Sequence, residues 1–390
     1  MKTFIKNGTV FTEDGISDKT LVIEDGKIID TDYLGAIPEG SKIIDAKGNY
    51  VMPGFVEIHA HGGGGADFMD KTADAFETVA KTHRNCGTTT ILPTTVAASY
   101  ESLLKVFETY RKVSASKTIN FGGLHLEGPF ISMEMKGAQN PAFIRNPEKA
   151  EVDALIEAGG DIIKKCTVAP EIPGIDYLAK KFTDNGIYLS SGHSNGTFSD
   201  IEKGFTLGIR HITHMYSNTP TVRKINQTVY AGIVEAAYYI DDMRIEFIGD
   251  GCHFPKEALK MAVKIKGVDK IKLTSDAMRA AGTNASESYL GECLPENRVI
   301  IENGVAKLPD RSFFAGSIAT SDRMLRWAHF DAGLELSDAL RLLALSPSKA
   351  VGIDKEKGSI KKGKDADIII LNKDLFVEET FISRDFKQMR

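Results

Sequence analysis

Strand-like apolar segments alternate with helix-like segments along most of this chain, and that alternation constrains the fold more than any other feature. Predicted strands lie at 51–61, 88–92, 121–127, 162–169, 187–193, 211–214, 245–250 and 271–276. Stretches typical of helices separate most of them, at 73–85, 100–113, 147–158, 177–185 and 256–265. Eight strands alternating with helices predict an α/β fold, a parallel (β/α)₈ barrel. A doubly wound open sheet is the competing fold.

Several predicted strands end in side chains that bind metals or transfer protons. They are His59 and His61, Glu127, His193, His214, Asp250 followed by His253, and Asp276. The C-terminal strand ends of a barrel converge on one site, whereas those of an open sheet are spread along an edge. The clustering of these residues therefore favours the barrel.

Both ends of the chain have the pattern of short strands and tight turns. Asn7-Gly8, Asp14-Gly15 and Asp25-Gly26 interrupt apolar stretches in the first fifty residues and are hairpin signals. Near the C-terminus, a turn at 363–365 precedes the apolar run 368–371. We expect the two ends to pair into one small sheet unit, with the larger domain inserted between them.

Charge and cysteine usage exclude several classes of function. The 48 basic and 53 acidic residues give a net charge of −5, which does not favour nucleic acid as a partner. The four cysteines have no C-x-x-C spacing, so neither a disulfide framework nor a structural zinc knot is expected. Because there is no apolar run of about 18 residues and no signal-peptide pattern, we expect a cytoplasmic protein without membrane contact.

His59 and His61 form an H-x-H motif in an apolar, extended segment. Side chains at i and i+2 of a strand point to the same face, so two imidazoles would lie side by side in the barrel. Such a pair suits zinc or iron. The alternative is two unrelated histidines, but a buried histidine at the end of an apolar strand needs a partner.

Glu127, His193 and His214 supply further ligand types at the ends of other strands. A carboxylate at the end of an apolar strand is costly unless it is paired or metal-bound, and a buried salt bridge is the alternative for Glu127. Each histidine taken singly is more often structural than catalytic. Together with His59 and His61, these residues offer the nitrogen and oxygen ligands that a catalytic metal site requires.

Asp276 follows the last predicted strand and precedes Ala277-Met278-Arg279. An aspartate in this position could cap the next helix. Beside a water activated by a metal it would instead carry protons.

These segments, in this order, resemble the amidohydrolase superfamily and, within it, the N-acetylglucosamine-6-phosphate deacetylase family. The matching pieces extend over nearly the whole chain. They include MPGFVEIHAHG at 52–62, HLEGPF at 125–130, SGHS at 191–194, THMY at 213–216, DGCH at 250–253, SDAMRAAG at 275–282 and FAGS at 314–317. HLEGPF is the most specific, because Glu127 stands where many superfamily relatives use a carboxylated lysine.

The resemblance implies a (β/α)₈ barrel at 53–353 and a small β-sandwich domain built from 1–52 plus 354–390. It implies metal-dependent hydrolysis of the acetamide of N-acetylglucosamine 6-phosphate, releasing glucosamine 6-phosphate and acetate. It also implies a homodimer, in which a basic residue of the neighbouring subunit reaches the sugar phosphate.

The resemblance further assigns roles to individual residues. Glu127, His193 and His214 are expected to bind one divalent metal and His59 and His61 a second, so that two ions are favoured over one; zinc, iron and manganese suit the ligands comparably. Asp276 is expected to be the general base and acid. The expected substrate contacts are Ala138, Gln139, Ser217, Asn218, Arg223 and His253.

The chain departs from the family pattern near the substrate residues. The family reads T-H-x-x-N-A-M after the last histidine ligand, whereas Ser217 and Asn218 stand here in place of Asn-Ala. Another N-acetylhexosamine, phosphorylated or not, or an N-acyl amino acid is therefore the alternative substrate. A paralogue that binds sugar phosphates without catalysis is the alternative of another class, and the intact ligand set argues against it.

Overall fold

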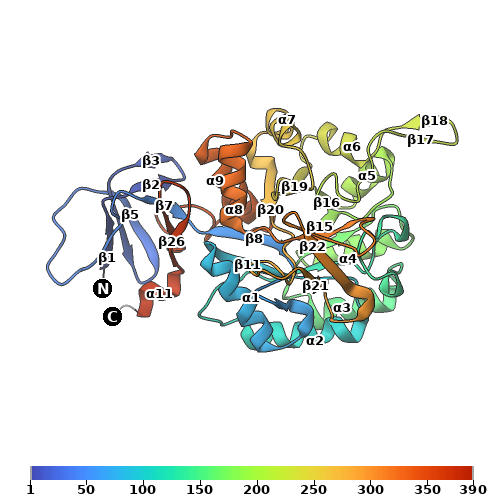
Figure 1. The fold of residues 1–390 in the computed structure, drawn as a ribbon, viewed down its shortest axis with the longest axis horizontal. Coiled ribbons are helices and arrows are strands. Elements are labelled where there is room, and N and C mark those ends of the chain that lie inside the picture. The colour runs from blue at the N-terminus through green and yellow to red at the C-terminus, as the bar shows by residue number, and fades with distance from the viewer. Residues whose placement is uncertain (1, 389–390) are drawn as a thin grey trace.

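The computed structural model describes residues 2–388 and has two parts, a barrel and a smaller sheet-rich unit beside it (Figure 1). Eight parallel strands form the barrel wall. They are β8 (Phe55–Ala60), β11 (Thr88–Thr95), β13 (Leu124–Glu127), β14 (Ile163–Val168), β15 (Tyr188–Ser191), β16 (Ile209–Ile212), β19 (Arg244–Ile248) and β20 (Ile271–Thr274). Each pairs in parallel with its neighbour, and a bridge between Ala60 and Ala277 closes the ring. The predicted barrel is confirmed.

Helices surround the strands, and their ends follow local capping rules. The helices are α1 (Ala73–Asn85), α2 (Tyr100–Val113), α3 (Lys149–Gly159), α4 (Ile175–Asp184), α5 (Phe198–Thr206), α6 (Ile233–Tyr239), α7 (Lys256–Lys266), α8 (Ser321–Arg326), α9 (Leu336–Leu343) and α10 (Leu345–Ala350). The side chains of Thr72 and Ser99 accept hydrogen bonds from the first turns of α1 and α2. α1 buries Phe76, Val79 and Ala80 against the barrel, as helical periodicity requires.

The smaller unit contains two sheets, of which the first is N-terminal and the second joins both ends of the chain. A four-stranded sheet has the order β5 (Lys27–Tyr33), β4 (Thr20–Glu24), β1 (Lys2–Lys6), β6 (Lys42–Asp45). A five-stranded sheet has the order β26 (Val377–Phe381), β25 (Ile368–Leu371), β7 (Tyr50–Pro53), β2 (Thr9–Thr12), β3 (Gly15–Ser17). Because β25 pairs with β7, the predicted union of the two chain ends is confirmed.

One strand predicted as continuous is two strands. The segment 51–61 divides into β7, which belongs to the smaller unit, and β8, which belongs to the barrel. Gly54 separates them at a close contact, since a Cβ there would lie 2.1 Å from the side chain of Thr89. The chain thus leaves one sheet and enters the other at Pro53-Gly54. The prediction of a single strand was wrong because both strands are apolar, so hydropathy alone shows no break.

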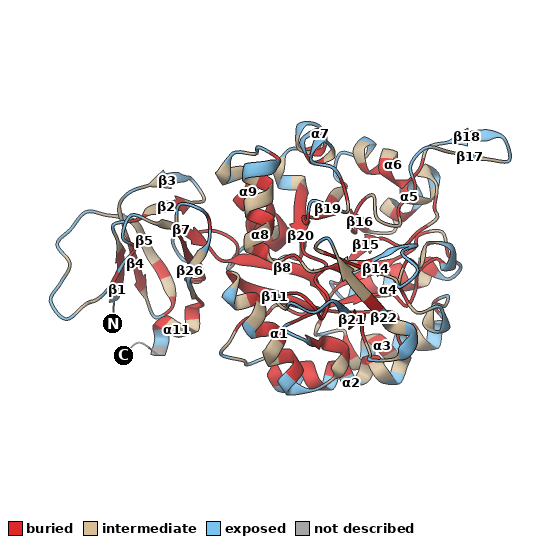
Figure 2. Ribbon diagram, viewed as in Figure 1, coloured by how far each residue is buried: buried red, intermediate tan, exposed pale blue. Residues whose placement is uncertain are grey.

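Shorter elements complete the structure. β9 (Gly62–Gly63) and β10 (Ala66–Asp67) form a small hairpin after β8, and β12 (Asn120–Phe121) pairs with β11. β17 (Arg223–Ile225) and β18 (Thr228–Tyr230) form a hairpin that projects from the barrel and is largely exposed (Figures 1 and 2). β21 (Glu287–Tyr289), β22 (Arg298–Glu302), β23 (Val305–Lys307) and β24 (Phe314–Ser317) form an antiparallel sheet. α11 (Ser383–Gln388) ends the described chain.

The apolar cores lie between strands and helices, whereas much of the barrel interior is polar. Figure 2 shows the barrel strands as almost entirely buried. Among the buried side chains are Lys165, Lys272 and Glu246, which are 2%, 2% and 0% exposed and come from β14, β20 and β19. Every helix among residues 2–388 is too short or too polar to cross a membrane.

Candidate metal centre and active site

Six of the predicted site residues converge at the C-terminal mouth of the barrel. His59 lies on β8 and Glu127 ends β13, whereas the other four follow strand ends: His61, His193, His214 and Asp276. Two groups of three have ligand atoms within 4.8 Å of one another: His59, His61 and Asp276 form one, and Glu127, His193 and His214 form the other. All six side chains are buried. The structure therefore brings together the residues on which the sequence argument depended.

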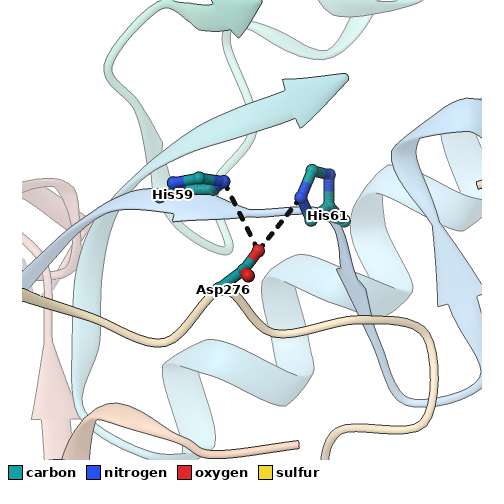
Figure 3. A group of neighbouring side chains, drawn as sticks. All are labelled: His59, His61 and Asp276. Carbon is teal, nitrogen blue, oxygen red and sulfur yellow. Dashed lines mark ion pairs between the residues drawn. The ribbon is translucent and has the colours of Figure 1, made fainter. Parts of the chain in front are cut away.

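The carboxylates of Glu127 and Asp276 lie between the histidines. Oδ1 of Asp276 is 3.4 Å from Nε2 of His59 and 3.1 Å from Nε2 of His61 (Figure 3). Oε1 of Glu127 is 3.2 Å from Nε2 of His59 and 3.0 Å from Nε2 of His214. Glu127 thus contacts both groups of ligands, which makes one continuous centre.

Each of the four histidines directs Nε2 toward this centre and holds Nδ1 against an oxygen outside it. Nδ1 of His61 is 3.3 Å from the carbonyl oxygen of Thr94. Nδ1 of His193 contacts the carbonyl of Met135 at 2.9 Å, and Nδ1 of His214 that of Ser217 at 3.1 Å. Nδ1 of His59 contacts a carboxylate oxygen of Glu246 at 2.8 Å. Protons on Nδ1 leave the Nε2 lone pairs free, which is the usual arrangement of metal-binding histidines.

The donor set fits a divalent cation. Nε2 of His59 is buried and makes no hydrogen bond of good geometry, although carboxylate oxygens of Glu127 and Asp276 lie 3.2 and 3.4 Å away, and this is costly in the absence of a ligand. Nε2 of His193 and Nε2 of His214 are only 3.2 Å apart, although a neutral imidazole whose Nδ1 is protonated has no proton on Nε2. Imidazole nitrogens and carboxylate oxygens are ligands of zinc, iron and manganese. A cation at the centre satisfies all of these groups together.

The electrostatics of the centre also call for positive charge. Burial opposes ionisation of Glu127, but His59, His193 and His214 outweigh it and hold the pKa of Glu127 well below its usual value. Burial likewise opposes ionisation of Asp276, and His59 and His61 lower its pKa nonetheless. The same contacts raise the pKa of His59 and His61, so the carboxylates are anionic only beside positive charge. Bound by neutral histidines, a divalent cation would supply that charge instead.

Three residues of the centre have a left-handed backbone. The φ angles of His193, His214 and Asp276 are 48°, 32° and 47°. Residues other than glycine adopt this conformation at an energetic cost, and such residues gather at functional sites. The bend at each strand end turns these side chains toward the centre. The helix cap considered for Asp276 is wrong, because turns and strand β21 follow it before any helix.

A pocket of about 360 Å³, including its mouth, lies over the centre. Of the residues predicted to contact substrate, Ala138, Gln139, Ser217, Asn218 and His253 line it. Arg223 does not line it; this residue lies in the projecting hairpin, where its guanidinium donates to the carbonyl oxygens of Asn195 and Gly196.

Two of the pocket residues have partners that suggest distinct roles. Nε2 of Gln139 donates to Oε2 of Glu127 at 2.8 Å, and its Oε1 accepts from the backbone N–H of Ala97 at 2.8 Å. Gln139 thus holds a carboxylate of the centre. Nδ1 of His253 lies 2.7 Å from Oδ2 of Asp250, which fixes the ring. Its ring packs on Phe314, with centroids 4.7 Å apart.

Sequence reasoning missed four residues of this region. Leu290, Phe314 and Gly316 line the pocket, and Glu246 supports His59. The motif at 314–317 matched the family pattern and contains Phe314 and Gly316, but the sequence did not indicate that it lies at the pocket. Gly316 has a φ of 75°, and a Cβ there would lie 3.0 Å from the carbonyl oxygen of Asp276. Leu290 and Glu246 lie in no sequence motif that would have indicated a functional role.

The model of the amidohydrolase family matches residues 50–388. The chain belongs to the amidohydrolase family. The resemblance and the hydrolase class expected from the motifs are confirmed.

The chain is similar over its full length to enzymes of one named activity. It is 30% identical to N-acetylglucosamine-6-phosphate deacetylase of Haemophilus influenzae, and the match covers 100% of both chains. It is 29% identical to the enzyme of the same name from Bacillus subtilis, covering 99% of this chain and 98% of the other.

Solved structures with the same activity in their names have the same fold. The Pasteurella multocida deacetylase superposes with a TM-score of 0.91 at 27% identity, over 98% of both chains. A mutant deacetylase from Mycobacterium smegmatis, in complex with N-acetyl-D-glucosamine-6-phosphate, superposes with a TM-score of 0.88 at 26% identity, also over 98% of both chains.

Proposed function

We propose that this chain hydrolyses the acetamide of N-acetylglucosamine 6-phosphate, yielding glucosamine 6-phosphate and acetate. The observation that carries the proposal is the convergence of four imidazole Nε2 atoms and two carboxylates beneath one pocket. The similarity to deacetylases over the whole chain indicates the substrate class.

The two ligand groups would hold one divalent metal ion each, and zinc, iron and manganese all suit them. One group is His59, His61 and Asp276; the other is Glu127, His193 and His214. We favour two ions because Glu127 contacts both groups. When bound, the metal supplies Lewis acidity, which polarises the acetamide carbonyl and lowers the pKa of water.

Asp276 is the proton carrier in this proposal. Its ionised carboxylate accepts a proton from the attacking water as the new C–O bond forms. It then donates that proton to the nitrogen, so that the C–N bond breaks and a neutral amine leaves. One carboxylate can perform both steps because it lies beside the centre and beneath the pocket.

The remaining pocket residues would hold the sugar. His253, fixed by Asp250, presents Nε2 as a partner for a sugar hydroxyl, and Phe314 and Leu290 supply apolar surface. Ser217 and Asn218 offer further hydrogen bonds where the family has Asn-Ala. The described residues that line the pocket include neither lysine nor arginine, the side chains that make the strongest hydrogen bonds to a phosphate.

We propose that a homodimer supplies the missing cation. The β17–β18 hairpin carries Arg223 and Lys224 and exposes apolar side chains that a partner would cover: Val222, Val229 and Tyr230 are 50%, 59% and 43% exposed. Exposed apolar residues gathered on a projecting element are typical of an interface between proteins. In this arrangement the hairpin of one subunit would extend toward the pocket of the other.

Acetate release from defined substrates tests the proposed function. The protein should release acetate from N-acetylglucosamine 6-phosphate much faster than from unphosphorylated N-acetylglucosamine, because a phosphate contact contributes binding energy. Faster release from another N-acetylhexosamine 6-phosphate would reassign the sugar and retain the chemistry. No acetate from any N-acyl substrate, with metal bound, would contradict the proposal.

A further inference from the structure

His59 is held differently from the other three histidines of the centre. Backbone carbonyl oxygens lie against Nδ1 of His61, His193 and His214, whereas the carboxylate of Glu246 lies against Nδ1 of His59. A carbonyl oxygen can only accept a hydrogen bond, and a peptide backbone cannot be exchanged for another group. The orientation and tautomer of His59 therefore depend on a replaceable side chain.

Glu246 is itself held by a buried cation. Its Oε1 is 2.8 Å from Nδ1 of His59, and its Oε2 is 2.6 Å from Nζ of Lys165. The side chains of His59, Glu246 and Lys165 are 0%, 0% and 2% exposed. The three residues come from β8, β19 and β14, so the chain of contacts crosses the barrel interior. Both carboxylate oxygens of Glu246 are therefore shielded from bulk solvent.

A second buried lysine in the same interior has another partner. Nζ of Lys272 is 3.1 Å from Nδ1 of His211. The carboxylate oxygens of Glu246 are thus divided between His59 and Lys165. Both partners donate: Lys165 has only protons to offer, and His59 must then carry its proton on Nδ1.

We propose that Glu246, oriented by Lys165, is a positioning residue that sets the tautomer of His59 and thereby controls metal binding by His59, His61 and Asp276. A proton held on Nδ1 by the carboxylate leaves the Nε2 lone pair facing the centre. A proton on Nε2 would block coordination by that nitrogen. The inference rests on the metal-binding role proposed above.

The proposal makes a specific prediction for an amide at position 246. In Glu246→Gln, the ammonium group of Lys165 can only donate, so the new amide turns its carbonyl oxygen toward Lys165 to accept that hydrogen bond. The NH₂ group is then directed at His59, whose Nδ1 must accept, so its proton moves to Nε2. Replacing Lys165 by methionine in the same chain removes that requirement, and the amide can turn its oxygen back to His59. The second substitution should therefore rescue the first.

Zinc binding measures this effect without reference to catalysis. The wild type, Glu246→Gln, and the double variant Glu246→Gln/Lys165→Met would be stripped of metal and titrated with Zn²⁺ by calorimetry, with zinc counted after dialysis. We expect Glu246→Gln to bind Zn²⁺ about 10–100-fold more weakly at one of two sites, and the double variant to recover most of that loss. Lys272→Met is the matched control, because it removes a buried lysine without touching either oxygen of Glu246.

Each outcome has one meaning. Equal zinc binding by the wild type and Glu246→Gln overturns the inference, and so does a double variant that binds zinc more weakly than the single one. A wild type that binds no zinc, iron or manganese contradicts the proposed function instead. If Glu246→Gln does not fold, ¹⁵N spectra of the metal-free wild type decide: a proton on Nδ1 of His59 supports the inference, and a proton on Nε2 overturns it.

Discussion

At the scale of single residues, the chemistry of this protein depends on which atom of each side chain faces the centre. His125 shows the contrast. It shares the barrel face of Glu127, but its Nδ1 contacts the hydroxyl of Thr94 at 3.3 Å and its Nε2 that of Thr167 at 2.7 Å. With both nitrogens occupied, His125 packs on the ring of His59 and is not available as a ligand. Its residue type alone would not have excluded it.

The proton-carrying role proposed for Asp276 predicts the behaviour of Asp276→Asn. The amide keeps the size of the carboxylate but cannot accept a proton, so acetate release should fall by at least about 10²-fold. Circular dichroism and the zinc content of the Glu127, His193 and His214 group should remain unchanged. A variant that releases acetate at nearly the wild-type rate would remove Asp276 from the mechanism.

Gln139 provides a second test at this scale. Gln139→Met keeps the volume but removes the hydrogen bond to Oε2 of Glu127, so we expect metal affinity to fall by about tenfold. The sequence-based role, a direct substrate contact, predicts instead an increased KM with metal affinity unchanged. Zinc titration and initial-rate kinetics on the same preparation separate the two.

At the scale of elements, the sequence predicted what local rules govern and missed what tertiary contacts govern. The helices at 73–85 and 100–113 have the predicted bounds because Thr72 and Ser99 cap them. The positive φ angles of His193, His214 and Asp276 could not be predicted, because residues other than glycine rarely adopt that conformation, although histidine and aspartate do so more often than most. Glu246 and Lys165 could not be paired either, since they meet only across the closed barrel and are 81 positions apart.

The contact between the N-terminal hairpin and the C-terminal segment should contribute a pH-dependent part of the stability. Burial opposes ionisation of Glu13, but hydrogen bonds from Lys361, Ser359 and Lys364 lower its pKa from 4.5 to about 2. A lowered pKa in the folded state stabilises the protein above pH 4.5, and that stabilisation is lost as the pH falls toward 2. Because 24% of the Glu13 side chain is exposed and solvent screens its partners, we expect about 1 kcal/mol at most.

Urea unfolding of the wild type and Glu13→Gln measures this contribution. The difference in unfolding free energy should be largest near pH 6 and should vanish as the pH approaches 2. Other acid-sensitive groups are common to both chains and cancel in the difference. A difference that does not vary with pH would contradict the ionic origin of the contact.

At the scale of the whole molecule, the smaller sheet unit and the candidate active site occupy different parts of the fold. The smaller unit joins both chain ends beside the barrel (Figure 1), while candidate ligands from four barrel strands or their ends and from the turn after β20 meet at the mouth. The sequence could predict this division, because each strand end carried its own signal. It could not show that neither lysine nor arginine lines the pocket among residues 2–388, since that requires the positions of all lining residues.

Homodimer formation through the β17–β18 hairpin gives a prediction at this scale. Val229→Glu places a charge on the exposed apolar face of the hairpin and should shift the protein from dimer to monomer in light scattering. Its KM for the phosphorylated substrate should rise with the loss of the partner's basic residues. Ile16→Glu is the matched control, because Ile16 is 62% exposed on β3 in the other unit. A monomeric wild type would contradict the dimer.

The central claim is that six buried side chains at the barrel mouth hold a hydrolytic metal. Anomalous diffraction from zinc-loaded crystals, measured at the zinc edge, tests this most directly. The account predicts strong peaks about 2.0–2.2 Å from Nε2 of His59 and His61 and from Nε2 of His193 and His214, with Glu127 and Asp276 as oxygen ligands. Zinc-loaded crystals with no anomalous peak among these six residues would contradict it.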